Sequence, residues 1–279
     1  MNPSSPAEIR QRSLSSLREG YSRGMRRFEI GSIAVCSVAM LWLVVRIAPA
    51  AAHAPWLVLT AIMLGYVVAD LVSGLVHWAA DTWGTPDVPV VGKALIRPFR
   101  EHHVDQKEIT RHDFVETNGN NCFICIVPVA LASLLPMRST LGLFGAALVL
   151  SMCFFVLCTN QFHKWAHLDA PPPLIDWMQR MHVILPRDHH AVHHTAPYAK
   201  YYCITVGWLN EALYRVRFFQ TLERLITATT GALPREDDIG KHAALVVARE
   251  LPPEPPRLDL TRIELSSEMS PGAPLAKPE

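Results

Sequence analysis

The stretch LGLFGAALVLSMCFFVLCTNQFHKWAH, residues 141–167, joins a long apolar run to a pair of histidines. Residues 141–158 carry no charged side chain and are apolar on every side, so a helix formed by them needs a buried or lipid environment. The run ends on Asn160, His163 and His167, whose i, i+3, i+7 spacing puts them on one helix face. This segment therefore predicts an embedded helix with a histidine pair at its end.

Three more apolar segments precede it, at residues 30–52, 55–80 and 122–137. Residues 122–160 are too long for one crossing of a bilayer, and Leu-Pro-Met-Arg-Ser at 135–139 favours a break between two helices. Some segments are shorter than the ~20 residues that a helix needs to cross ~30 Å of hydrocarbon. We predict an all-α integral membrane protein with four transmembrane helices, against the alternative of buried core helices in a soluble protein.

Positive charge is distributed unevenly around these segments. Residues 1–27 hold six arginines. The loop after the second segment carries Lys93, Arg97, Arg100, Lys107 and Arg111. Because cytoplasmic loops of membrane proteins carry an excess of such residues, both termini and residues 81–121 are predicted to be cytoplasmic. His77 and His163 end their segments on that same side, which predicts a histidine-rich cytoplasmic cap.

The overall composition excludes some classes of protein. A net charge of +1 gives no indication of a nucleic-acid partner. The six cysteines show no disulfide framework of a secreted domain. Cys122 and Cys125 have the spacing of a redox or metal motif, but they open an apolar segment, where cysteine packs as a small hydrophobe. Packing is therefore their predicted role.

Histidine is the residue type that points to chemistry. Eleven of the thirteen histidines lie between His77 and His194, and LPRDHHAVHH at 185–194 alone holds four. A mononuclear zinc site uses three or four protein ligands, so this number predicts two metal ions held mainly by imidazole. Zinc brings no redox chemistry, whereas iron activates oxygen. A thiol-poor site at a bilayer surface thus favours a non-haem diiron centre and a lipid substrate.

Acidic residues accompany these histidines. Asp70, His77 and Asp81 are spaced i, i+7, i+11 and share one helix face. Asp81 is predicted either to ligate metal or to orient an imidazole, and Glu101 is a second carboxylate suited to orienting one. Asp70 lies inside an apolar segment and is a candidate functional residue. Capping or hydrogen bonding of another helix explains Asp70 equally well.

Four stretches resemble the plasmanylethanolamine desaturase family of ether-lipid metabolism. They are DLVSGLVHWAADTWGT, VGKALIRPFREHHVDQKEITRHDFVETNGNNC, TNQFHKWAH and HVILPRDHHAVHH, the last continuing to YYCITVGWLN. The resemblance covers about residues 65–240. It implies insertion of a double bond into the 1-O-alkyl chain beside the ether oxygen, giving the vinyl ether of a plasmalogen. It also implies O2 as oxidant and electrons from a separate carrier of the cytochrome b5 or ferredoxin type.

The resemblance also implies a set of metal ligands. These are His77, His102, His103, His112, His163, His167, His190, His193 and His194, with Asp81 at an acidic catalytic position. His182 and His189 also align but rank lower, since His189 cannot share the helix face of His190 and His194. His53 and His242 are read as ordinary surface residues. The implied location is the bacterial inner membrane, or the endoplasmic reticulum membrane if the source is eukaryotic, with the active site on the cytoplasmic face.

The domain plan has three parts. Residues 1–27 form a polar N-terminal tail, 28–232 a membrane lipid desaturase domain, and 233–279 a Pro-rich tail predicted to be disordered and without chemistry. Residues 211–229 form an amphipathic segment, which either lies in the membrane interface or packs on the domain.

Three other functions stay open. A plant branch of the family desaturates acyl chains of phosphatidylglycerol, so an acyl-lipid desaturase is the first alternative. A lipid hydroxylase would use the same iron chemistry. A non-catalytic membrane metal-binding protein or metal transporter belongs to another class. A transporter would place ionisable ligands near the membrane midplane, whereas here they gather at one end.

Overall fold

The computed structural model describes residues 22–85, 87–88, 92, 96–195 and 197–236, and in helix α4 it leaves the side chains of residues 101 and 104 undescribed. The predictions for the far N-terminal and C-terminal tails, for Lys93, for His242 and for the Glu101 side chain concern residues outside this range. All regular elements of the described part are helical, which confirms the all-α prediction. In chain order they are α2 (Arg23–Ala51), α3 (Pro55–Thr82), α4 (Arg97–Val104), η2 (Glu108–Arg111), α5 (Phe114–Ala132), α6 (Thr140–Ala166), α7 (Pro173–Arg180), α8 (Arg187–His193), α9 (Trp208–Arg215) and α10 (Phe218–Thr230).

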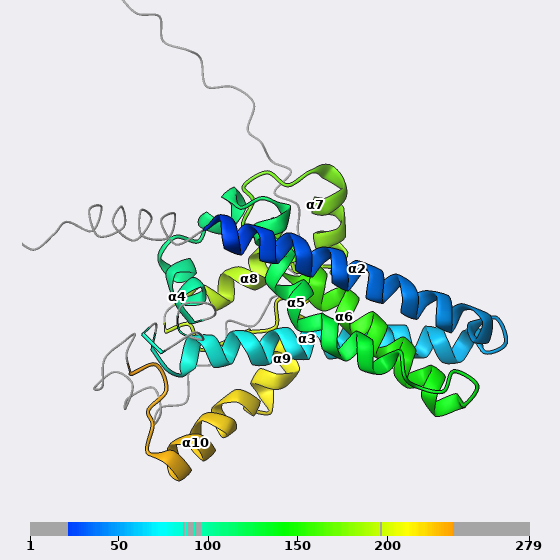
Figure 1. Ribbon diagram of the computed structural model, residues 1–279. Helices are drawn as coiled ribbons and strands as arrows, with labels where there is room; N and C mark the ends of the chain where they lie inside the picture. The colour runs from blue at the N-terminus through cyan, green and yellow to red at the C-terminus, as the bar shows by residue number, and fades with distance from the viewer. Residues whose placement is uncertain (1–21, 86, 89–91, 93–95, 196, 237–279) are drawn as a thin grey trace, which may run out of the picture.

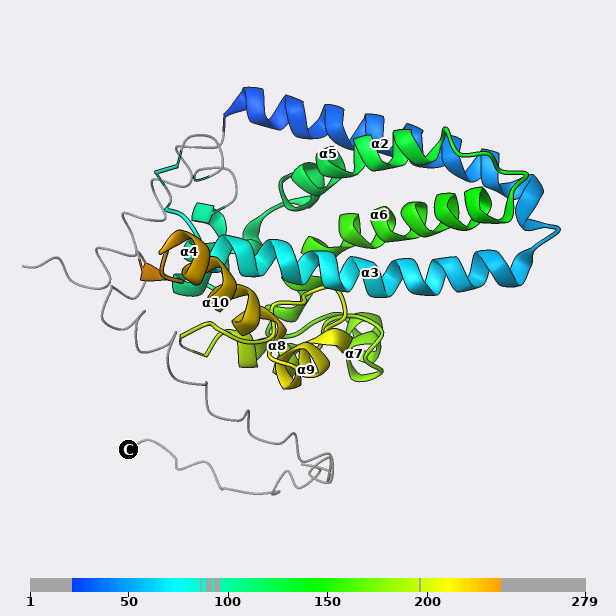
Figure 2. The same ribbon diagram turned by 90° about the horizontal axis from the view of Figure 1, so that it is seen from below.

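Four long helices, α2, α3, α5 and α6, form two hairpins that lie side by side (Figure 1). The turn between α2 and α3 and the turn between α5 and α6 lie at one end of these helices, and α4 and α8 lie toward the other (Figures 1 and 2). The short helices α8, α9 and α10 flank α3. Of the short helices, α4 and α8 lie toward the end where α3 and α6 finish, and α9 begins beside Asp70 in the middle of α3 (Figure 2).

Small residues allow the long helices to approach closely. Ala69 and Ala146 are fully buried in the shared core. A Cβ placed on Gly65 of α3 would lie 2.7 Å from the Leu148 carbonyl oxygen of α6, so only glycine fits this contact. Four cysteines, Cys36, Cys122, Cys125 and Cys153, are buried in the same core, and all are free thiols. Their role as packing residues is confirmed.

Large apolar side chains cover the outside of the same helices. Val38 is 69% exposed, Leu41 is 64% exposed and Leu141 is 82% exposed. Within the described residues, three helices are long and apolar enough to cross a membrane: α2, α3 and α6. An apolar outer surface of this kind is suited to lipid rather than to water.

The predicted fourth crossing corresponds to α5, which differs from the expected segment at both ends. It begins at Phe114 and carries Glu116, Asn118 and Asn121 in its first half, and it ends at Ala132 rather than at residue 137. Its apolar part, residues 122–132, is about 16 Å long at 1.5 Å per residue, about half of the hydrocarbon thickness. Three of the four predicted crossings are therefore supported, and the fourth stays a prediction.

The amphipathic segment at 211–229 is two helices, not one. Arg217 has a positive φ of 56° and separates α9 from α10. Phe219, at the start of α10, is buried against Trp78 and Tyr202, so this end packs on the domain. The described residues include the first four of the predicted C-terminal tail, and Arg235 among them is only 1% exposed.

Asp70 caps a helix from inside the bundle. Its Oδ1 accepts hydrogen bonds from the backbone N–H groups of Val206 and Gly207 at 2.9 Å, and its Oδ2 accepts one from Leu209 at 3.2 Å. These groups belong to the start of α9, whose N-terminal N–H groups have no partner within the helix. The capping explanation for Asp70 is therefore correct.

Substituting this cap should destabilise the protein without touching the metal ligands. Asp70→Ala removes the acceptor of three N–H groups, those of the buried Val206 and Gly207 and of the half-buried Leu209, and we expect the free energy of unfolding to fall by about 2–4 kcal/mol. Asp70→Asn keeps one carbonyl acceptor and should lose less. Thermal unfolding in detergent micelles, followed by circular dichroism, measures the difference. An unchanged unfolding temperature in Asp70→Ala would contradict the capping role.

Candidate metal centre

Four helix ends bring the candidate ligands together. His77 and Asp81 lie in the last turns of α3, and His163 lies in the last turn of α6 with His167 as its C-terminal cap. The adjacent pair His102 and His103 comes from α4, and α8 supplies His190, His193 and its cap His194. Figure 1 shows α4 and α8 lying at the histidine end of the long helices.

One group of candidate ligands, which we call the five-histidine cluster, consists of His102, His163, His167, His190 and His194. Their ligand nitrogens all lie within 4.8 Å of one another. The Nε2 atom of His190 lies 2.9 Å from the Nε2 atoms of His163, His167 and His194. The Nε2 atom of His102 lies 2.9 Å from that of His167.

The second group, the Asp81 cluster, consists of His77, Asp81, His103 and His193. Asp81 Oδ2 lies 3.2 Å from His77 Nε2, 3.6 Å from His103 Nε2 and 3.5 Å from His193 Nε2. The Nε2 atoms of His103 and His193 are 3.0 Å apart. Of the two roles expected for Asp81, the geometry favours metal ligation, because its carboxylate oxygen shares the convergence point of three imidazoles.

Helix periodicity explains how the residues divide between the clusters. The i, i+4 pairs His163–His167, His190–His194 and His77–Asp81 each supply one cluster, because residues four apart stack on one helix face. The adjacent residues His102 and His103 point in directions about 100° apart, so each joins a different cluster. The neighbours His193 and His194 divide in the same way. The two clusters therefore lie side by side.

The donor atoms fit a pair of metal ions. A neutral imidazole has one N–H, so His190 Nε2 cannot form hydrogen bonds with three neighbouring Nε2 atoms at once. Ligand nitrogens about 2.1 Å from an octahedral ion are about 3.0 Å apart, close to the observed spacing. Within the described part of the chain, the buried His77 Nε2 makes no hydrogen bond, although Asp81 Oδ2 is near. Convergent lone pairs of this kind are stabilised by a cation.

Backbone carbonyls fix the tautomer of two ligands. His77 Nδ1 donates to the Tyr202 carbonyl at 3.1 Å, and His193 Nδ1 donates to the Lys200 carbonyl at 2.8 Å. Each imidazole then carries its proton on Nδ1 and directs the Nε2 lone pair into the cluster. Tyr198 stacks on the His103 ring at a centroid distance of 4.2 Å. These carbonyl contacts could not be predicted from the sequence, because every residue type has a backbone carbonyl.

Burial keeps these histidines neutral. It lowers the pKa of His193 to about 4. Burial, followed by the charges of His193 and His102, lowers the pKa of His194 to about 2. The pKa of His103 is lowered by burial and then by His193. All three imidazoles are therefore uncharged at neutral pH, which is the form that binds metal.

Three predicted histidines lie outside both clusters. His112 Nε2 lies 3.6 Å from Glu116 Oε1, and a third of the His112 side chain is exposed. The His182 carbonyl accepts a hydrogen bond from the Trp208 indole at 2.8 Å. His189 accepts from the Asn210 amide at 3.1 Å and faces away from His190, as the helix geometry predicted. His53 is exposed at the α2–α3 turn, which confirms its reading as a surface residue.

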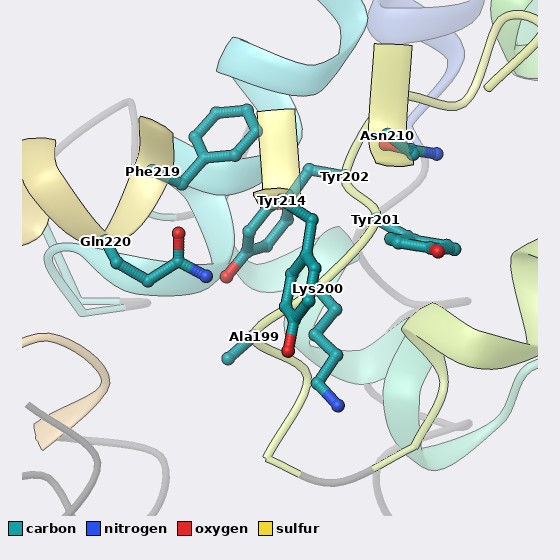
Figure 3. A pocket seen from close by; sticks show the side chains of 8 residues that line it. All are labelled: Ala199, Lys200, Tyr201, Tyr202, Asn210, Tyr214, Phe219 and Gln220. Carbon is teal, nitrogen blue, oxygen red and sulfur yellow. The ribbon is translucent and has the colours of Figure 1, made fainter. Parts of the chain in front are cut away.

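A small pocket lies beside the Asp81 cluster. Residues 199–202 line it together with Tyr214 of α9 and Phe219 and Gln220 of α10 (Figure 3). The Tyr202 ring centroid lies 4.9 Å from that of Phe219 and 5.5 Å from that of His193. Tyr202 therefore connects the start of α10 to the Asp81 cluster.

Comparison with known proteins gives consistent matches. The family described as lipid desaturase domain matches residues 66–237. The chain is 55% identical over 243 residues to plasmanylethanolamine desaturase of Myxococcus xanthus, covering 86% of each chain. It is 43% identical over 235 residues to plasmanylethanolamine desaturase 1 of Mus musculus, covering 78% of this chain and 83% of the relative. Fatty acid desaturase 4, chloroplastic, of Arabidopsis thaliana is 37% identical over 175 residues, 61% of this chain and 52% of the relative. No solved structure matches significantly.

Proposed function

Because the chain belongs to the lipid desaturase domain family, we propose that it is a plasmanylethanolamine desaturase, an oxidoreductase that introduces the vinyl-ether double bond into 1-O-alkyl ether phospholipids. The observation that carries this choice is the extent of the similarity. The two relatives with that name match 86% and 78% of the chain, whereas the plant fatty acid desaturase matches 61%. The two metal-ligand clusters at the ends of apolar helices supply the chemistry that such a reaction needs.

We assign one iron ion to each cluster. With one iron held by each cluster, the centre would supply the chemistry of an O2-dependent desaturation. In that reaction the alkyl CH2–CH2 unit, O2, two protons and two electrons from an external carrier yield CH=CH and two molecules of water. The carrier is of the cytochrome b5 or ferredoxin type. The chain's own residues hold the irons in neighbouring positions, since His102 and His103 supply one ligand to each cluster, as do His193 and His194.

The protein must also exclude water from these groups. His77, Asp81, His163, His190 and His193 are each no more than 4% exposed. A dry site limits loss of a strong oxidant to solvent or to side reactions. The apolar surfaces of α3 and α6 lead directly to the clusters, because both helices end in their ligands. An alkyl chain in the membrane can therefore approach the site along these helices.

The test is expression in cells that make alkyl ether phospholipids but lack vinyl ethers. Vinyl ethers hydrolyse in acid and alkyl ethers do not, so we expect an acid-labile, aldehyde-releasing lipid fraction. Lipid mass spectrometry identifies the product. New double bonds in acyl chains alone would favour the acyl-lipid desaturase, and a hydroxylated ether chain would favour the hydroxylase. Bound metal with no lipid product would favour the non-catalytic alternative.

For the topology, we propose that α5 is the fourth crossing and that both termini and the histidine-rich cap are cytoplasmic. Support comes from α5 itself, whose polar half begins at the histidine end while its apolar half runs beside α2 and α6. The exposed side chains of Leu174 and Trp177 on α7, and of Met181 at its C-terminal cap, follow an i, i+3, i+7 spacing, which suits contact between the cap and the membrane interface. The location is the bacterial inner membrane, or the endoplasmic reticulum membrane in a eukaryote.

Reporter fusions test this topology. A reporter joined after Met137, in the α5–α6 turn, should be external, because α2 and α3 return the chain to the cytoplasm before α5 crosses. A reporter joined after Thr85 should be cytoplasmic. Reporters whose activity depends on the compartment, such as a periplasmic phosphatase in a bacterial host, measure the side directly. The same side for both positions would contradict the fourth crossing.

A further inference from the structure

An ion pair lies buried next to the Asp81 cluster at the C-terminal end of the described chain. Arg235 is 1% exposed, and its guanidinium contacts both carboxylate oxygens of Glu223 on α10, at 3.1 and 2.8 Å. The backbone N–H of Arg235 donates to the Thr82 carbonyl at 2.8 Å. Burying two charges is costly unless their hydrogen bonds are satisfied, and it is weak evidence for stability alone. The contacts around the pair therefore indicate its role.

The other contacts of this pair are with residues that adjoin the Asp81 cluster. Arg235 Nη1 donates to the Tyr202 hydroxyl at 3.1 Å and to Thr82 Oγ1 at 3.2 Å. Glu223 Oε1 accepts from the Trp78 indole at 3.0 Å. In the sequence, Trp78 follows His77 and Thr82 follows Asp81.

Tyr202 has a second link to the same cluster. It is fully buried, and its carbonyl is the acceptor that fixes the tautomer of His77. The Tyr202 side chain is thus held by Arg235 while its backbone orients a metal ligand. The pair touches Trp78, Thr82 and Tyr202, and none of these three is itself a member of either cluster.

We infer that the Arg235–Glu223 pair positions the last turn of α3 and Tyr202, so that His77 and Asp81 hold the second metal ion of the centre. This inference rests on the proposed diiron function and extends it to Glu223 of the amphipathic segment and to Arg235, which lies in the tail predicted to have no chemistry. Arg235 and Glu223 are positioning residues, because they act through Trp78, Thr82 and Tyr202. Groups that hydrogen-bond a metal ligand directly typically change metal affinity by about 10- to 100-fold, and this pair acts one contact further from the metal, so we expect an effect of about 10-fold.

The experiment is an anaerobic Fe2+ titration of the full-length protein in detergent micelles. Wild type should bind two ions. Arg235→Gln should keep the ion of the five-histidine cluster and bind the second about 10-fold more weakly. Arg180→Gln is the matched control, since it makes the same change in an ion pair with Asp176 whose arginine is 71% exposed. Mössbauer spectra of the iron-loaded proteins then show which of the two sites is lost.

A second variant separates positioning from folding. Arg235→Met combined with Glu223→Met removes both charges and keeps the volume apolar, a change that buried ion pairs often tolerate in stability. It still removes the hydrogen-bond partners of Tyr202, Thr82 and Trp78. The folded double variant should therefore also bind the second ion weakly. If Arg235→Gln does not fold, the double variant tests whether the pair positions the second metal site.

The outcomes are distinguishable. Unchanged affinity for two ions in the folded variants would overturn the positioning role and leave the proposed function intact. A wild-type protein that binds fewer than two ions would overturn the diiron centre, and the positioning role with it. Truncation after Leu233 should reproduce the Arg235→Gln result, whereas truncation after Lys241 should bind iron like the wild type.

Discussion

His163→Ala is expected to abolish vinyl-ether formation, with the rate falling by more than about 100-fold. Loss of a group that only hydrogen-bonds a metal ligand typically lowers metal affinity or activity by about 10- to 100-fold, and loss of a ligand itself should lower them further. The Nε2 atom of His163 lies 2.9 Å from that of His190 and 3.2 Å from that of His167. The substitution takes one ligand from the five-histidine cluster. It also leaves a cavity in the interior, because the His163 side chain is only 4% exposed. Metal analysis should give about one iron per chain in place of two, with the protein still inserted in the membrane.

The control for this variant is His53→Ala, which removes an exposed imidazole at the opposite end of the helices. It should bind two irons and form vinyl ethers at the wild-type rate. Membrane fractionation confirms insertion of both variants. Full activity and two irons in His163→Ala would refute the assignment of the five-histidine cluster.

Asp81→Asn should eliminate the other ion. The substitution keeps the size of the side chain but removes the only carboxylate of the Asp81 cluster, whose other members are imidazoles. Carboxylate oxygen is a good ligand for iron, whereas a neutral amide is a weak one. We expect about one iron per chain and a loss of activity of more than about 100-fold, by the same reasoning as for His163→Ala.

The matched control is Asp169→Asn. Asp169 pairs with Lys107, but its side chain is 85% exposed, so solvent screens the interaction and little should change. Combining His163→Ala with Asp81→Asn should reduce the iron content to near zero, because each change empties a different cluster. If the two single variants lost the same ion, the division into two clusters would be incorrect.

Local periodicity explains why much of the site could be predicted. The spacing of His163 and His167, and of His190 and His194, fixes which side chains share a helix face, whatever the helix packs against. For the same reason, the sequence alone placed His189 away from its neighbour His190. Long apolar runs likewise indicated where the long helices lie, because a helix that is apolar on every side is stable only in a protein core or in lipid.

Other features depended on contacts between distant segments. His112 has the residue type of a ligand, yet it lies by Glu116 outside both clusters, since the loop after α4 directs it there. Asp70 is a cap because residues 206–209 come to lie beside it. Arg235 is buried because residues 231–236 return to Thr82, where Glu223 neutralises its charge.

The sequence by itself thus determined the helices, the ligand types and the pairs of ligands that act together. Only the tertiary structure divided eight of the nine predicted histidines, with Asp81, into two clusters, and only it supplied the Tyr202 and Lys200 carbonyls that orient His77 and His193. Helix periodicity acts over about four residues and is written in the local spacing. The approach of α4 and α8 to the ends of α3 and α6 is set by packing between segments far apart in the chain, which no local pattern records.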